Sequence, residues 1–156
     1  VRIKLRGSNR FVELEEGRQI PVGSTIDTTK GRVTLVAAGG QQADFYDGIF
    51  RISQGKGAKP LTTLTLVEAL SCPKAGKAVA AAKKKKRRLW GDGRGRFRTK
   101  GKHSAATVVG TKWLVEDPCT STLTRVVRGR VSVRDFAKKK TVIVRAGKKY
   151  VARARR

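Results

Sequence analysis

The stretch 94–135 constrains the fold most, because its apolar residues recur at nearly every second position. The alternation is clear in Ala106–Val108, Trp113–Val115 and Val131–Val133. Strict alternation buries one face of a strand, and the β-branched and aromatic residues found here suit a pleated sheet. Glycines separate the runs: Gly95, Gly101, Gly110 and Gly129. The pattern predicts an all-β fold of short antiparallel strands, arranged as a sandwich or a short β-solenoid, with little helix.

The same alternation continues on both sides of this stretch. The first residues predict a hairpin-like opening from Val1–Leu5 and Phe11–Leu14. Further strands are expected at Leu61–Leu70 and at Thr141–Val144, the second after a turn at Lys138–Lys140.

Two glycine-containing segments predict turns. Asp47-Gly48 lies between two apolar runs and is the strongest short hairpin signal in the chain. Gly91-Asp92-Gly93 is expected to turn the chain into the central stretch. A phosphate-binding loop there would need a following helix and a Gly-Lys-Ser/Thr ending, and the sequence has neither at this place.

The two halves of the chain, about 1–70 and 89–156, resemble each other. Residues 27–32 are similar to 98–102, and residues 45–52 are similar to 126–133. These similarities predict a single domain with an internal two-fold repeat, in which each half covers the apolar face of the other. A basic insertion at 74–88 separates the halves.

Charge is the outlying property of the composition. The 156 residues include 37 Lys and Arg against 11 Asp and Glu, a formal net charge of +26. Such a chain is attracted to polyanions or acidic surfaces, so the charge gives the sign of the partner and not its identity. The candidate polyanion-binding residues are Lys83, Lys84, Lys85, Lys86, Arg87, Arg88, Lys138, Lys139, Lys140, Arg153, Arg155 and Arg156.

The two cysteines, Cys72 and Cys119, each adjoin a proline in a turn-like setting. A disulfide between them in an oxidising compartment is the expectation. The alternative is two free thiols in a cytosolic protein.

No catalytic or metal-binding pattern accompanies these features. His103 is the only histidine, and the adjoining Ser104 with a distant aspartate does not make a catalytic triad. One histidine and two widely separated cysteines lack zinc-ligand spacing. We therefore expect no enzymatic activity, no cofactor and no metal. The sequence has no Met and begins with Val1, so we expect a piece of a longer polypeptide. It has no apolar run of 18 or more residues, so we expect no transmembrane segment in it.

Short motifs in both halves add a resemblance. Gly23-Ser24-x-Ile26-x-Thr28 precedes Arg32-x-x-Leu35, and Phe97-x-Thr99 precedes an Ala-rich segment that ends in Gly110-Thr111-x-Trp113. Over about residues 20–152 this arrangement resembles FecR-like domains, and the paired cysteines and high charge are most similar to the secreted actinobacterial type. The residues assigned to the motif or to structural roles are Thr99, Gly110, Thr111, Trp113, Gly129 and Gly147.

The resemblance implies an all-β domain outside the cytoplasm, secreted or at the cell surface, and without enzymatic activity. The expected function is a structural or binding module of a larger surface or secreted protein, whose basic surface contacts an anionic envelope polymer or an acidic partner. An intracellular nucleic-acid-binding protein is the alternative, and the oxidation state of the cysteines distinguishes the two.

Overall fold

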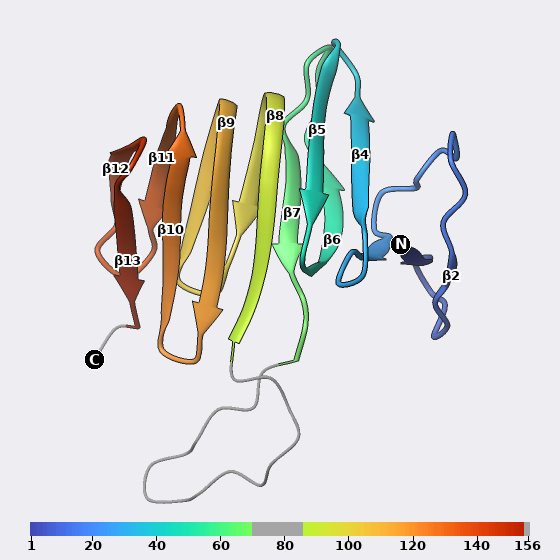
Figure 1. Ribbon diagram of the computed structural model, residues 1–156, viewed down its shortest axis with the longest axis horizontal. Helices are drawn as coiled ribbons and strands as arrows, with labels where there is room; N and C mark the ends of the chain where they lie inside the picture. The colour runs from blue at the N-terminus through green and yellow to red at the C-terminus, as the bar shows by residue number, and fades with distance from the viewer. Residues whose placement is uncertain (70–85, 155–156) are drawn as a thin grey trace, which may run out of the picture.

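The computed structural model describes residues 1–69 and 86–154 and contains no helix there, which confirms the all-β prediction (Figure 1). The strands are β1 (Arg2–Lys4), β2 (Val12–Glu13), β3 (Thr25–Asp27), β4 (Arg32–Ala37), β5 (Gln41–Tyr46), β6 (Ile49–Gln54), β7 (Thr62–Leu66), β8 (Lys86–Lys100), β9 (Ser104–Pro118), β10 (Ser121–Arg128), β11 (Arg130–Asp135), β12 (Lys140–Arg145) and β13 (Lys149–Arg153). The expected opening hairpin is present, because β1 pairs with β2.

One branched sheet folds into two layers. The front layer runs β4-β5-β8-β9-β10-β13, and the back layer runs β2-β1-β3-β6-β7-β8-β9-β11-β12 (Figure 1). The long strands β8 and β9 belong to both layers. Residues 90–94 of β8 pair with β5, whereas residues 97–100 pair with β7. The two layers therefore share a pair of continuous strands.

The bend in β8 lies at a β-bulge between Arg94 and Phe97. Gly95 has a φ of +117° there, which an L side chain rarely adopts. The buried Gln41 fills the inside of the bend, where its Oε1 accepts from the Arg96 amide and its Nε2 donates to the Pro60 carbonyl. A bulge of this kind lets one strand leave the front layer and continue in the back layer.

Strand direction departs from the prediction at one place. The expected strands were all antiparallel, but β7 and β8 are parallel, with Leu64 opposite Thr99. A parallel neighbour needs a crossover connection, and here the connection between β7 and β8 contains the segment 70–85, which lies outside the described residues.

The core lies between the layers and is built from the inward-facing residues of the alternating strands. Phe45 of β5 lies at its centre, with ring centroids 5.4 Å from Phe97 and 6.0 Å from Trp113 in edge-to-face arrangements. Phe45 and Trp113 come from the front layer and Phe97 from the back part of β8. The aromatic cluster therefore joins the two layers.

The hairpin prediction at Asp47-Gly48 is wrong. Strand β5 pairs with β4 and β8, and β6 pairs with β3 and β7, so the two strands that flank this turn belong to different layers. Thr28 fixes the corner: its hydroxyl donates to the Gly48 carbonyl, and its own carbonyl accepts from the Asp47 amide. Asp47 has a φ of 67°. Asp47 and Gly48 do form a tight turn, as predicted. The strands on either side of it do not pair with each other, because contacts with residues distant in sequence, such as Thr28, determine their partners.

The turn predicted at Gly91-Asp92-Gly93 is also wrong, because these residues lie inside β8. A Cβ on Gly91 would lie 2.6 Å from the Trp113 ring, and one on Gly93 would lie 2.4 Å from the Ala43 Cα. The glycines are thus needed for close approach between strands and not for a turn.

The internal repeat is visible in one of its two segments. In 45–52 and in 126–133, a tight corner at Gly48 or Gly129 joins strands of different layers, and each of these strands forms a hairpin with the strand next to it in sequence on its other side. The segments 27–32 and 98–102 differ: the first connects the layers, whereas the second leads into the β8–β9 hairpin.

Candidate polyanion-binding surface

The basic run predicted from the sequence is divided in the structure. Lys83, Lys84 and Lys85 lie outside the described residues, as do Arg155 and Arg156. Lys86, Arg87 and Arg88 were expected in a basic insertion, but they open strand β8. The reason is pairing with β9, which sets Lys86 opposite Pro118 and Arg88 opposite Glu116.

These three cations already have acidic partners. Lys86 Nζ lies 3.8 Å from Glu116, and Arg88 Nε lies 3.1 Å from Asp47. Arg87 points inward, where its Nε and Nη2 each lie 3.0 Å from Asp117 Oδ2. Each of the three charges is therefore shared with a carboxylate, and Arg87 is engaged in a buried ion pair, while their role in polyanion binding stays a prediction.

The other predicted cations that the structure describes are accessible. Lys138 and Lys139 lie in the turn between β11 and β12, Lys140 opens β12, and Arg153 ends β13. All four are exposed. All four lie at strand ends or in the turn between β11 and β12.

Strand register creates a larger basic surface on the outside of the back layer. One row of neighbouring residues runs Lys4, Thr25, Arg51, Thr65, Lys100, Ala105, Arg134 and Thr141 across β1, β3, β6, β7, β8, β9, β11 and β12. Arg98 lies in the next row, and Arg130 and Arg145 lie opposite each other beyond it. We define the basic face as Lys4, Arg51, Arg98, Lys100, Arg130, Arg134 and Arg145.

Acidic side chains lie elsewhere. In the described part of the chain, they reach the outside of the back layer only at its β1–β2–β3 end, where Arg2 lies between Glu13 and Asp27. On the front layer, Asp44 and Asp92 pair with Arg32, and Asp92 also pairs with Arg128. Carboxylates therefore pair with Arg32 and Arg128 on the front layer, whereas none of the ion pairs between described residues involves a cation of the basic face.

An aromatic stack covers the middle of the front layer. Tyr46 and Trp90 are stacked with an interplanar angle of 7° and a centroid separation of 6.1 Å. The Arg32 guanidinium lies 4.7 Å from the Tyr46 ring, and the Arg125 guanidinium lies 5.5 Å from the Trp90 ring. Strand order places the two arginines on the outer sides of the pair. Both faces of both rings are therefore occupied, which leaves no face for stacking a base or a sugar.

The motif residues have structural contacts. The Trp113 indole donates to the Thr99 hydroxyl in the core at 3.0 Å. The Thr111 hydroxyl donates to the Arg130 carbonyl at the second corner. Gly129 has a φ of 80°, and a Cβ there would meet the Gly110 carbonyl at 2.5 Å. Gly147 has a φ of 83° in the turn between β12 and β13.

The single histidine lies beside a buried polar cluster. The His103 amide donates to the Thr122 hydroxyl, which in turn donates to Asp117. Burial lowers the pKa of His103, although Asp117 acts in the opposite direction. Neither His103 Nε2 nor the Ser104 hydroxyl makes a hydrogen bond to the described residues. The hydrogen bond between nucleophile and base that a catalytic serine needs is therefore not formed between them.

A second buried carboxylate lies near this cluster. The Tyr150 hydroxyl donates to Asp135 at 2.7 Å, and the Lys138 amide donates to the same carboxylate. Burial opposes ionisation of Asp135, but these hydrogen bonds outweigh it and lower the pKa of Asp135. The same bond raises the pKa of Tyr150 to about 12. The pair ties β13 to the end of β11.

The predicted disulfide depends on a residue beyond the described part. Cys72 lies outside the described residues, so the pairing of Cys72 with Cys119 stays a prediction. Cys119 lies in the turn between β9 and β10, directly after Pro118, and no described cysteine is a free thiol.

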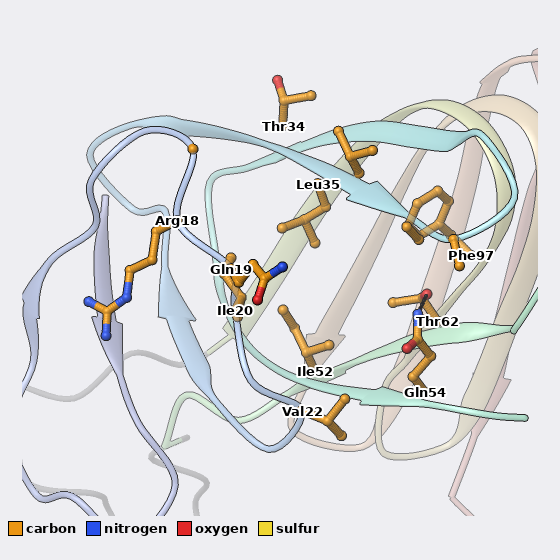
Figure 2. A pocket seen from close by; sticks show the side chains of 14 residues that line it. Arg18, Gln19, Ile20, Val22, Thr34, Leu35, Ile52, Gln54, Thr62 and Phe97 are labelled. Atoms are coloured by element: carbon orange, nitrogen blue, oxygen red, sulfur yellow. Dashed lines mark hydrogen bonds between the residues drawn. The ribbon is translucent and has the colours of Figure 1, made fainter.

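A cavity of about 540 Å³ lies at the open end of the sandwich, between β4 and β6 (Figure 2). Leu35, Ile52 and Phe97 line its inner part, and Arg18 extends away from them in Figure 2. The lining holds no acidic, histidine or cysteine side chain. Among the described residues, no group of three or more potential metal ligands is found, and no helix is long and apolar enough to cross a membrane.

Comparison with known proteins adds information on the fold. No protein-family model and no curated protein matches the chain. The fold is similar to the crystal structure of a candidate anti-sigma factor from Parabacteroides distasonis, with a TM-score of 0.50 and 9% sequence identity over 83% of this chain. The match spans 54% of that protein, about half its length. At this identity the similarity shows the fold alone.

Proposed function

We propose that this chain is a non-catalytic binding module that works outside the cytoplasm, as part of a larger surface or secreted protein, and contacts an anionic polymer through the basic face. One observation carries the proposal: Arg51, Lys100 and Arg134 lie in one row across the back layer, and the described strands place no carboxylate in that row. A row of cations with no carboxylate partner among the described residues suits an extended polyanion. The resemblance of the sequence to FecR-like domains supports a location outside the cytoplasm.

The first test removes four cations from one row of the basic face. We expect Lys4→Gln, Arg51→Gln, Lys100→Gln and Arg134→Gln together to weaken binding of long-chain polyphosphate. The slope of log K against log salt concentration should fall in magnitude by roughly 2–3, since each lost phosphate contact contributes about 0.7. Binding is measured by fluorescence anisotropy over a series of salt concentrations.

The matched control removes four accessible cations that lie outside the basic face: Lys138, Lys139, Lys140 and Arg153. It has the same net charge as the first variant. Equal loss of binding in both variants would mean that total charge, and not the basic face, attracts the polymer.

The oxidation state of Cys72 and Cys119 tests whether the protein works in an oxidising compartment outside the cytoplasm. Intact mass of protein from its native source, with and without reduction and alkylation, should show a species lighter by two hydrogens that reductant converts to two alkylated thiols. Two thiols that are alkylated without reductant would remove the support for an oxidising compartment and favour the intracellular nucleic-acid alternative.

A further inference from the structure

Two arginines of the basic face are direct neighbours across a strand pair. Arg130 of β11 lies opposite Arg145 of β12, and both side chains are exposed. Like charges directly opposite each other destabilise a sheet. No described carboxylate pairs with either arginine. An anion between the two guanidinium groups would convert this repulsion into two attractive contacts.

The structure has a hollow at this place. It measures about 690 Å³ and is lined by the two arginines, by the hydroxyl-bearing Thr107 and Ser132, and by Ile143. Ile143 is 52% exposed, although it lies in the middle of a strand. Gly110 and Gly129 form the adjoining wall. Charged, hydroxyl and apolar groups therefore meet in one depression.

We infer that this hollow binds an acidic sugar unit of an anionic polysaccharide. The inference rests on the proposed function and names the class of polymer. A carboxylate or sulfate accepts from the planar guanidinium forks of Arg130 and Arg145. The sugar hydroxyls hydrogen-bond with Thr107 and Ser132, and the apolar face of the sugar ring packs on Ile143. A polyphosphate chain would accept hydrogen bonds from Arg130 and Arg145 but has no apolar face to pack on Ile143.

The rest of the basic face fits the continuation of such a polymer. In the row that holds Arg51, Lys100 and Arg134, each cation lies two strands from the next. Neighbouring strands are about 4.8 Å apart, so the cations recur roughly every 10 Å across the sheet. An extended sugar unit is similar in length to one strand spacing. The row therefore suits a polysaccharide with an acidic group on every second sugar.

The residues between the cations support a sugar more than a nucleic acid. Thr65 and Ala105 lie between them, so the gaps hold one hydroxyl group and one small side chain. The stacked rings of Tyr46 and Trp90 are on the opposite layer, with both faces covered. Base stacking, which supplies much of single-strand nucleic-acid binding, has no platform there.

The test uses three probes: a hyaluronan hexasaccharide with one carboxylate in every second sugar, a neutral chitin hexasaccharide, and polyphosphate. Binding to the full chain is measured by isothermal titration calorimetry at fixed salt. Arg130→Gln with Arg145→Gln should weaken hyaluronan binding by about tenfold or more, the effect of losing charge-assisted hydrogen bonds. Arg6→Gln with Arg10→Gln removes the same charge from exposed sites at the β1–β2 end, away from the hollow, and should change hyaluronan binding less than about twofold.

Ile143→Thr separates the sugar from a bare anion, because threonine suits a strand and keeps the fold. It should weaken hyaluronan binding several-fold and leave polyphosphate binding unchanged, while the chitin hexasaccharide binds weakly to every form. If polyphosphate binds through the basic face but hyaluronan binding does not depend on Arg130, Arg145 or Ile143, the sugar assignment fails and the proposed function stands. If no anionic probe binds through the basic face, both fail.

Discussion

Replacing Asp117 by alanine should lower the free energy of unfolding by about 3–5 kcal/mol, the cost of leaving one member of a buried ion pair without its partner. The Asp117 side chain is 1% exposed and accepts from the Arg87 guanidinium, the Lys102 amide and the Thr122 hydroxyl. The substitution leaves a buried guanidinium charge and two buried donors unsatisfied. Chemical denaturation followed by tryptophan fluorescence measures the change.

Asp44→Ala is the matched control. Asp44 also pairs with an arginine, at 2.8 Å from Arg32 Nε, but its side chain is 29% exposed and Arg32 is 51% exposed. Water screens this pair, so its loss should cost less than about 1 kcal/mol. If the two variants lose the same stability, burial does not determine the strength of these ion pairs and the account of Asp117 is wrong.

Trp113→Ala should have an effect of similar size, a loss of about 3–5 kcal/mol, because it opens a large cavity in the core. Trp113 is fully buried, contacts Phe45 edge to face and donates to Thr99. Its ring also fills the space above Gly91. Urea denaturation gives the free energy, and an unchanged m-value would show that the variant still unfolds in one step from a compact state.

The other tryptophan provides the comparison. Trp90 lies on the outside of the front layer, stacked on Tyr46 and covered by Arg125. Its replacement by alanine loses one aromatic pair and one cation–π contact, about 1–2 kcal/mol, and leaves no internal cavity. A larger loss at Trp90 than at Trp113 would contradict the assignment of the core.

The strands of this fold could be predicted from the sequence because alternation is a local signal. In 130–135, for example, Val131 and Val133 are buried while Arg130 and Arg134 are exposed. The pairing of strands could not be predicted in the same way. Asp47-Gly48 has the composition of a hairpin turn but joins different layers, since Thr28, twenty residues away, holds the corner.

The structural role of Gly91 and Gly93 could not be determined from the sequence for a related reason. The sequence indicated that Gly91 and Gly93 are special, but a turn and a close strand contact require the same residue type. Only the position of Trp113 and Ala43 across the sheet distinguishes the two. The prediction of a turn failed because the crowding group comes from another strand.

The proposed basic face could not be predicted from the sequence for the opposite reason: its cations are distant along the chain and adjacent only across the sheet. Lys86–Arg88 are consecutive and conspicuous, yet they are paired with carboxylates. Arg51, Lys100 and Arg134 are isolated in the sequence and become neighbours only through register. The available signal was weaker: each lies at an outward position of an alternating strand.

The order of the strands also determines how the domain responds to tension. The edge regions that contain β1 and β13 lie at opposite ends of the sheet, with the strands arranged side by side between them (Figure 1). Because antiparallel backbone hydrogen bonds run across the strands, a pull on β1 and β13 acts along these bonds and opens them one after another. We therefore expect a domain pulled at these two edges to open strand by strand at low force.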